Sequence, residues 1–362
     1  MTEEPTTAAL REEFAATIGD GRASPWRAAF AAVPRHPFVP EFFRQDERGR
    51  WQRVTGSDPG YLRSVYSDAA LMTQLDADGV PTSSSSEPGL MLAMLDALDA
   101  APGDTVFELG TGTGYHAALL AHRLGGENVT SVDIDPALVS LASRRLREVR
   151  EPGPVPHVAV GDGAFGHPPR APYTRFIATA ALRSVPVPLL EQAVDGAVIV
   201  APIGLAVVRA TVGAPGHADG RFLPFPALFM PRRSPGKAPD FAGARRLAPE
   251  PTALPVADVL ARVRFPLSLA LPGFSSCSWR SDDGTVTGVG IWTDDGSTAA
   301  ADVDGYVRQT GPRRLWDIVE ELAALFPAGH PAREDFGLTV TPDGQRAWYV
   351  TPDGPSWPLP AG

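Results

Sequence analysis

The sequence predicts an α/β fold in which helices flank a largely parallel β-sheet, followed by a smaller α+β domain. Three observations lead to this prediction. Between 89 and about 232, short apolar runs of strand type alternate with helical runs. A glycine-rich turn follows the first of these strands, as in sheets that bind ligands at their carboxyl edge. Beyond 255 the alternation stops, and Asp-Gly turns separate short strands, as in hairpins.

The composition narrows the class of protein. The chain has 362 residues, of which 43% are hydrophobic, so it can build two or three folded domains. A net charge of −10 disfavours a nucleic acid as the main partner, because phosphate binding requires a basic face. The single cysteine, Cys277, rules out a disulfide framework, and no metal site is expected. The chain starts without a signal-like segment and has no membrane-length apolar run, so we expect a cytoplasmic protein with no membrane partner.

The first 88 residues are expected to form an N-terminal helical segment and a loop. Apolar residues at helical spacing predict one helix over 8–19, which Gly19 and Gly21 would end, and a second over 24–34. Residues 61–88 are polar and rich in serine, and we expect them to form a loop.

The central region, 89–232, carries the alternating pattern. Its predicted helices cover 89–100, 114–125, 136–149 and 187–194. Its predicted strands cover 104–110, 128–134, 156–162, 174–181 and 196–204, with a further antiparallel pair over 206–213 and 222–231.

The last third of the chain has a different character. Residues 233–254 are rich in Pro, Gly, Ala and charge, so they are expected to be a linker to an α+β domain over 255–362. Hairpins are predicted over 276–303 and 336–359, with an amphipathic helix over 311–329 between them. Tryptophans in a small domain are usually core residues, although some could line a recognition face; here they are Trp279, Trp292, Trp316, Trp348 and Trp357.

The glycine-rich turn is the first candidate site. It reads Glu108-Leu109-Gly110-Thr111-Gly112-Thr113-Gly114-Tyr115 between a strand and a helix. Glycines permit positive φ and let a ligand approach the backbone closely. A dinucleotide-binding turn has a similar pattern, and a tight turn without a ligand is the plain structural reading.

Two later strand ends narrow the choice of ligand. Asp133, with Ile134 after it, ends the next strand and can accept hydrogen bonds from ribose hydroxyls; Asp162 ends the third strand and can meet an adenine amino group. Either carboxylate could instead be an ordinary turn residue. Glu108 would repel a diphosphate but suits a sulfonium and an ammonium group, which favours S-adenosylmethionine over NAD. The predicted cofactor-binding residues are Glu108, Gly110, Thr111, Gly112, Thr113, Gly114, Tyr115, Asp133, Ile134, Gly161, Asp162, Gly163 and Thr179.

Three stretches together resemble the protein-L-isoaspartate O-methyltransferase family. They are VFELGTGTGYHAALLA (106–121), the run over 161–204, and the upstream motif VPRHPFVPE (33–41). The likeness covers roughly 30–210. It implies a Rossmann-like class I methyltransferase sheet that converts S-adenosylmethionine to S-adenosylhomocysteine. It also implies a peptide or protein partner whose aspartyl or isoaspartyl carboxylate is esterified.

The resemblance also assigns residues at the methyl-transfer site. The family has a Thr-Ile-Ser-Gln-Pro-like loop, and Ser86 aligns with its serine, flanked by Ser84 and Ser85. Ser85 and Glu87 depart from the family pattern. Ala180, Leu182 and Arg183 fall where the family has a substrate loop, and Arg183 is either a partner for a substrate carboxylate or a solvated side chain. His36 and His116 are conceivable bases, but a structural or solvent-facing position is favoured for each.

Three later pieces of the chain, over 220–234, 315–326 and 335–359, resemble the tail of methyltransferases that accompany ATP-grasp ligases or lanthionine-forming enzymes. Such relatives methylate an aspartate in a ribosomally made precursor peptide, and a backbone amide then displaces the ester to give an aspartimide. A C-terminal domain that reads the peptide would suit this task. Two alternatives stay open: a general enzyme for repair of isoaspartyl residues, and a catalytically silent binding module.

Overall fold

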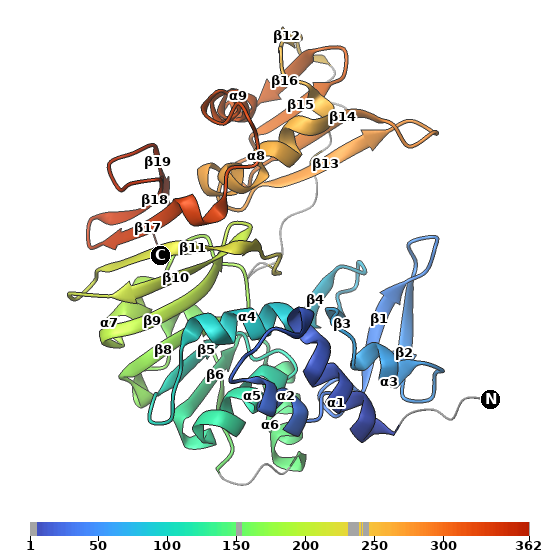
Figure 1. The fold of residues 1–362 in the computed structure, drawn as a ribbon. Coiled ribbons are helices and arrows are strands. Elements are labelled where there is room, and N and C mark those ends of the chain that lie inside the picture. Colours follow the sequence, from blue (N-terminus) through green and yellow to red (C-terminus); the bar gives the residue numbers. More distant parts are fainter. Residues whose placement is uncertain (1–5, 150–153, 231–238, 240, 242–245, 362) are drawn as a thin grey trace. The chain divides into compact units, whose positions relative to one another are not determined.

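The computed structural model describes residues 6–149, 154–230, 239, 241 and 246–361, and Figure 1 labels its elements. The chain divides into two compact units. Unit 1 comprises Met1–Ala180, Pro186–Ala201 and Arg209–Asp219; unit 2 comprises Ala181–Val185, Pro202–Val208 and Gly220–Gly362. Most of the predicted linker (233–238, 240 and 242–245) lies outside the described residues. The predicted domain boundaries stay predictions.

Both predicted N-terminal helices are present in unit 1. They are α1 (Thr7–Thr17) and α2 (Arg27–Ala32), and a short helix, α3 (Tyr61–Val65), follows. Gly19 and Gly21 end the first helix as predicted, with φ of 57° and 69°. Phe14, Trp26 and Phe30 bury their side chains almost completely, which anchors the segment in the unit.

The prediction of a loop over 61–88 is wrong for much of its length. Strands β1 (Glu41–Gln45), β2 (Trp51–Thr55), β3 (Leu71–Leu75) and β4 (Pro81–Ser85) form an antiparallel sheet in the order β2-β1-β3-β4. Each hairpin turn is closed by an aspartate. Asp46 accepts backbone hydrogen bonds from Arg48 and Arg50, and Asp76 accepts them from Asp78 and Val80. The strands are polar because this sheet is only partly buried.

The main sheet of unit 1 contains the elements predicted between 89 and 204. Its parallel strands run in the order β9-β8-β5-β6-β7. Helices α5 and α6 pack on β6 and on β6 and β7, respectively. The bounds are α4 (Pro88–Leu98), β5 (Val106–Leu109), α5 (Tyr115–Leu124), β6 (Val129–Asp133), α6 (Pro136–Glu148), β7 (His157–Val160), β8 (Tyr173–Ala178), α7 (Val187–Glu191) and β9 (Ala193–Ile203).

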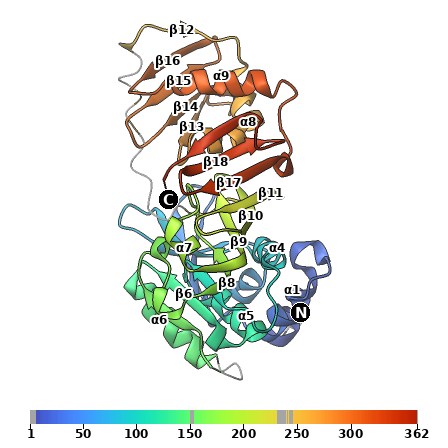
Figure 2. The same cartoon turned by 90° about the vertical axis from the view of Figure 1, so that its left-hand side faces the viewer.

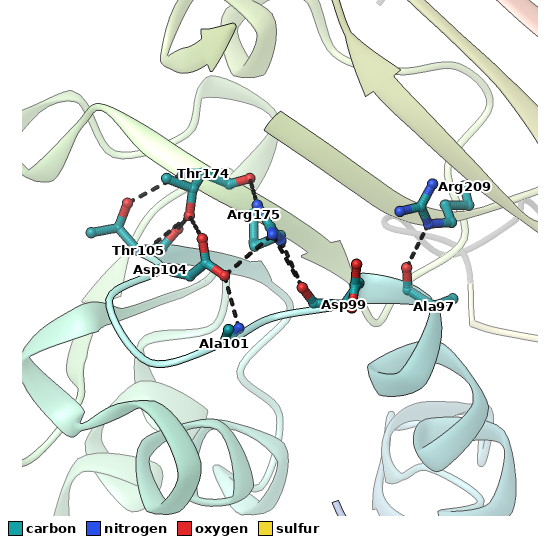
Figure 3. Close-up of polar contacts among 8 residues, drawn as sticks. All are labelled: Ala97, Asp99, Ala101, Asp104, Thr105, Thr174, Arg175 and Arg209. Atoms are coloured by element: carbon teal, nitrogen blue, oxygen red, sulfur yellow. Dashed lines mark hydrogen bonds and ion pairs between the residues drawn. The ribbon is translucent and has the colours of Figure 1, made fainter. Parts of the chain in front are cut away.

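A polar network ties together the amino ends of β5 and β8 (Figure 3). Arg175 in β8 lies 3.3 Å from the Asp104 carboxylate and donates to the Asp99 carbonyl at 3.1 Å. Thr174 donates to the same Asp104 carboxylate at 2.8 Å. Arg209 donates to the carbonyl of Ala97, in α4, at 2.8 Å. This network lies at the opposite edge of the sheet from the carboxyl ends, where parallel sheets bind ligands.

Strands β9, β10 (Ala206–Val212) and β11 (Ala218–Pro226) each have residues in both units. Within unit 2, β12 (Glu250–Pro251), β13 (Ser275–Arg280), β14 (Val286–Trp292), β15 (Thr298–Asp302) and β16 (Tyr306–Thr310) form an antiparallel sheet. Helices α8 (Val256–Ala270) and α9 (Leu315–Leu325) pack against this sheet and each other (Figure 2). Strands β17 (Phe336–Thr341), β18 (Gly344–Tyr349) and β19 (Ser356–Leu359) form the last predicted hairpin and its extension.

The tryptophans of unit 2 divide into two groups. Trp316 and Trp348 are 1% and 5% exposed, so they are core residues. Trp279, Trp292 and Trp357 are half-buried. Among the described residues, no helix combines the length and the apolar character needed to cross a membrane.

Candidate active site

The structure brings the predicted cofactor-binding turns together at the carboxyl ends of β5, β6, β7 and β8. Backbone hydrogen bonds link these turns in pairs. Gly110 N–H donates to Val132 at 2.8 Å, Gly161 N–H to Asp133 at 2.9 Å, and Thr179 N–H to Leu109 at 2.8 Å. Segments predicted separately from the sequence therefore form one surface on unit 1.

The glycine turn must stay bare for reasons visible in the structure. Gly110 has a φ of 99°, and a Cβ there would lie 2.6 Å from the Thr179 hydroxyl. Gly114 has a φ of 88°, and a Cβ there would lie 3.0 Å from Cβ of Ala142 in α6. Positive φ and close approach both exclude larger residues. The glycines thus let the turn that precedes α5 pack closely against Thr179 and Ala142.

The carboxylate of Asp133 is hydrogen bonded to Gly112, in the middle of this turn. It accepts the N–H of Gly112 at 2.8 Å and the N–H of Asp135 at 3.0 Å. Burial raises the pKa of Asp133 above its usual value, although these two hydrogen bonds oppose the shift. A carboxylate has about four lone-pair positions, so two remain for the hydroxyl groups of a ligand. Ile134 is 51% exposed beside it and adds an apolar surface.

Asp162 occupies the equivalent place on the next strand. It is the N-cap of the short 3₁₀ helix Gly163–Phe165 and accepts the N–H of Ala164 at 3.1 Å. A Cβ on Gly163 would lie 2.5 Å from Cγ of Leu109, so this turn packs directly on β5. Because β6 and β7 are parallel neighbours, Asp162 and Asp133 end strands side by side.

Glu108 differs from its predicted role as a group that faces the ligand. The side chain is 0% exposed, with one carboxylate oxygen 2.6 Å from Nδ1 of His116 and the other hydrogen bonded to Ser131. The Ser131 hydroxyl is also 2.6 Å from that of Thr111. Glu108 therefore stabilises the turn through hydrogen bonds inside the protein. Because its side chain is not exposed, it can influence a bound cation only through the electrostatic effect of its charge. His116 is structural, as the sequence analysis favoured.

Tyr115, Thr111 and Thr113 are also buried, at 6%, 3% and 4% exposure. The Tyr115 ring packs against Phe30 and Phe38, with ring centroids 6.2 Å and 5.7 Å away. Their predicted contact with a cofactor is therefore limited to backbone atoms.

The serine run lies against the glycine turn. A Cβ on Gly112 would meet the Ser84 carbonyl at 3.5 Å and the Ser83 hydroxyl at 3.8 Å. Ser83 and Ser85 are buried, whereas Ser84 and Ser86 are partly exposed. The alternation follows from the extended strand, in which successive side chains point to opposite faces. The predicted methyl-transfer residues and the predicted cofactor turn are thus neighbours within unit 1.

The predicted substrate loop divides between the units. Ala180 follows Thr179 in unit 1, whereas Leu182 and Arg183 belong to unit 2. Leu182 is 6% exposed, so its side chain is a core residue rather than a substrate contact. Arg183 is neither free nor simply solvated, since it forms an ion pair with Asp294, also in unit 2.

Two contributors to this region were not predicted. Gln74 of β3 donates to the Asp135 carboxylate at 3.0 Å, joining the small sheet to the start of α6. Arg35 is fully buried and hydrogen bonds to Ser85. Burial lowers the pKa of Arg35 to about 10, so it stays charged at neutral pH. The motif over 33–41 was the available signal for Arg35.

The comparisons with known proteins agree with this geometry. The family described as protein-L-isoaspartate(D-aspartate) O-methyltransferase matches residues 24–213. Protein-L-isoaspartate O-methyltransferase 1 of Archaeoglobus fulgidus is 36% identical over 177 residues, which cover 49% of this chain and 70% of the relative. The corresponding protein of Ignicoccus hospitalis is 34% identical over 209 residues, covering 56% and 86%.

A solved structure described as a protein-L-isoaspartate O-methyltransferase has the same fold. Its TM-score is 0.55 at 20% identity, and the match covers 96% of this chain and 100% of that one. A match of this extent includes most of unit 2.

The site fits S-adenosylmethionine in its chemistry. Gly110 packs directly against Thr179, so the turn admits no side chain there, and Asp133 keeps acceptor positions for ribose hydroxyls. The fold, the site and the family match lead to one conclusion. The chain belongs to the protein-L-isoaspartate(D-aspartate) O-methyltransferase family, and it is an S-adenosylmethionine-dependent protein carboxyl O-methyltransferase.

Proposed function

We propose that this enzyme methylates the side-chain carboxylate of an aspartate in a ribosomally made precursor peptide. A backbone amide nitrogen then attacks the ester carbonyl and loses its proton, methanol leaves, and an aspartimide ring closes. One observation carries the assignment of carboxyl transfer: the serine run, with the carbonyl of the partly exposed Ser84, lies next to the bare turn at Gly112.

The chemistry asks the protein for position rather than for a base. S-adenosylmethionine supplies an activated methyl group when bound. An aspartyl carboxylate is already ionised at neutral pH, so no side chain must remove a proton. Ser86 can donate a hydrogen bond that orients the carboxylate, and Asp133 can hold the ribose. Accurate placement of two reactants supplies most of the rate in such transfers. The engagement of His116 with Glu108 is consistent with the absence of a required base.

Two features support a dedicated peptide as the substrate. The family match ends at 213, so 149 residues of the chain (362 − 213) lie beyond it. A domain over 255–362 that reads the substrate offers the added surface that selection of one aspartate requires. The serine run also departs from the family pattern at Ser85 and Glu87, beside the serine that would meet the substrate.

Repair of isoaspartyl residues is the second candidate, and specific observations favour it. The curated relatives share the description of protein-L-isoaspartate O-methyltransferase. The solved structure with that description matches most of unit 2 as well, so a C-terminal region of this fold fits a protein with that description too.

The two functions separate by substrate. The enzyme is incubated with S-adenosylmethionine and three probes: an isoaspartyl peptide, its aspartyl twin, and precursor peptides encoded beside its gene. Mass spectrometry follows the gain of one methylene and the later loss of methanol. Methylation of a precursor aspartate with no reaction of the isoaspartyl probe supports the proposal. Reaction of the isoaspartyl probe alone refutes it in favour of repair.

A further inference from the structure

Arg35 is a buried cation in an unusual setting. Its side chain has no exposed surface, and its seven hydrogen bonds go to neutral oxygens. Burying a charge without such compensation costs several kcal/mol, so a charge kept in this way requires a full set of acceptors. The arginine therefore organises whatever backbone supplies these acceptors.

One group of acceptors lies just after α3. The Arg35 guanidinium donates to the carbonyls of Val65 at 3.0 Å, Ser67 at 3.1 Å and Ala69 at 3.1 Å. Three carbonyls within five residues thus converge on one cation and fix the course of this segment.

The other group of acceptors is the serine run itself. Arg35 donates to the Ser85 hydroxyl at 3.2 Å and 3.1 Å, to the Ser85 carbonyl at 3.2 Å and to the Ser86 carbonyl at 3.1 Å. Arg35 therefore holds the backbone on both sides of the Ser86 Cα through the carbonyls of Ser85 and Ser86. It also lies 6.0 Å from the ring of Tyr115, the first residue of α5 after the glycine turn.

The carboxylate of Asp68 restrains the chain just after the serine run. Asp68, within the segment that Arg35 holds, accepts the N–H of Gly89 at 2.6 Å and the N–H of Gly19 at 2.9 Å. Only Glu87 and Pro88 separate Gly89 from Ser86. The serine is thus restrained through its own carbonyl and from three residues downstream.

We propose that Arg35 is a positioning residue for methyl transfer, which fixes the backbone of Ser86, two residues beyond the Ser84 carbonyl that meets the glycine turn, by clamping Ser85 and Ser86 to the 65–69 segment. This inference rests on the proposed function of Ser86. It requires arginine specifically, because a planar guanidinium offers five donors in a fixed fork, whereas a lysine ammonium has three donors at one point.

The first experiment measures the clamp without using activity. Hydrogen exchange of the peptide over 81–90 is compared between wild type, Arg35→Lys and the control Arg175→Lys. The control removes a comparable arginine at the opposite edge of the sheet. We expect faster exchange over 81–90 in Arg35→Lys only. Equal exchange in all three proteins would overturn the proposal.

The second experiment is a double-mutant cycle on turnover with the probe that the wild type methylates. We expect Arg35→Lys to lower kcat by about 10–100-fold, as misplacement by about 1 Å does. S-adenosylhomocysteine affinity should stay within about threefold, which corresponds to about 0.65 kcal/mol. In the Ser86→Ala background, the same substitution should change kcat little, because it acts through that serine.

The results distinguish the two proposals. Independent, multiplicative effects of Arg35→Lys and Ser86→Ala would show that Arg35 does not act through Ser86, and the inference fails. A wild type that methylates none of the probes would refute the proposed function, while hydrogen exchange would still decide whether Arg35 clamps the run. An Arg35→Lys enzyme with wild-type kcat and exchange would refute the clamp even if the function holds.

Discussion

Asp133→Ala removes the carboxylate that joins the glycine turn to the end of β6. The wild-type side chain accepts hydrogen bonds from Gly112 at 2.8 Å and from Asp135 at 3.0 Å, and it is predicted to accept two more from a ribose. The substitution therefore has two separable effects, one on the fold and one on the cofactor.

The magnitudes follow from these contacts. Each hydrogen bond to a charged group contributes about 1.5–3 kcal/mol. Because water can reach the vacated site and satisfy part of the freed N–H groups, we expect the free energy of unfolding of the free enzyme to fall by about 2–4 kcal/mol. Loss of the ribose contacts should weaken binding by about 1.5–3 kcal/mol, or roughly 10–150-fold in Kd.

Calorimetry with S-adenosylhomocysteine and urea unfolding measure the two effects. Asp135→Ala is the matched control, because Asp135 caps α6 through Ala137 and Leu138 and bonds to Gln74. It should lose about 1 kcal/mol of stability as a lost cap while keeping its affinity. An Asp133→Ala protein that binds the nucleotide as tightly as wild type would refute the ribose assignment.

Acid provides an independent check on Asp133. Burial raises its pKa in the folded protein, so it takes up a proton at a higher pH than an ordinary aspartate with a value of 3.8. The protonated form loses acceptor capacity for a ribose. Nucleotide affinity should therefore begin to fall, as pH is lowered, above the range of an ordinary aspartate. In Asp133→Ala this acid-dependent loss should be absent.

Three further outcomes are expected. Ser86→Ala should lower kcat by at least about tenfold and leave S-adenosylhomocysteine affinity unchanged in calorimetry, because the serine is assigned to the substrate carboxylate; unchanged kcat would remove it from the site. Arg183→Gln should raise KM for the peptide while Asp294→Asn does not, if Arg183 exchanges its partner for a substrate carboxylate; equal KM values in both would contradict this role. Burial, followed by the nearby Arg11, lowers the pKa of His36 below 6.5, so the unfolded chain takes up the proton first and stability should decline as pH falls below about 6.5; His36→Gln should flatten this decline in urea unfolding at pH 7 and 5.5.

The main sheet of unit 1 could be predicted because its local signals agree with one another. Strand β5 is wholly buried and apolar except for Glu108, the glycines follow at once, and α5 has helical spacing. Because both residues follow the carboxyl ends of parallel strands, the topology alone places Asp133 and Asp162 at the same end of the sheet.

The small N-terminal sheet was missed because its strands lack that apolar signal. Polar residues dominate β4, and β3 interrupts its apolar residues with Thr73 and Gln74. Both turn signals, around Asp46 and Asp76, resemble those recognised as hairpins only later in the chain. Helix α8 was missed as well, and it contains Pro266, a residue that normally ends helices.

The burial and the hydrogen-bond partners of the charged site residues could not be predicted from one sequence. Glu108 occupies a suitable position for a ligand contact, but its partners His116 and Ser131 come from α5 and β6. Arg35 stands in a recognised motif, yet its acceptors lie 30 to 51 residues away along the chain. Such partnerships depend on packing, which local sequence patterns do not specify.

Because burial alternates along Ser83–Ser86, changes in the length of this serine run are constrained. An insertion or deletion of an odd number of serines here would turn the inward hydroxyls outward and carry Ser86 to the wrong face. A gain or loss of two serines would keep each hydroxyl on its face of the strand but would change the length of the run. Length variants of this tract should therefore survive selection in steps of two, and an enzyme with three or five serines should be inactive though folded.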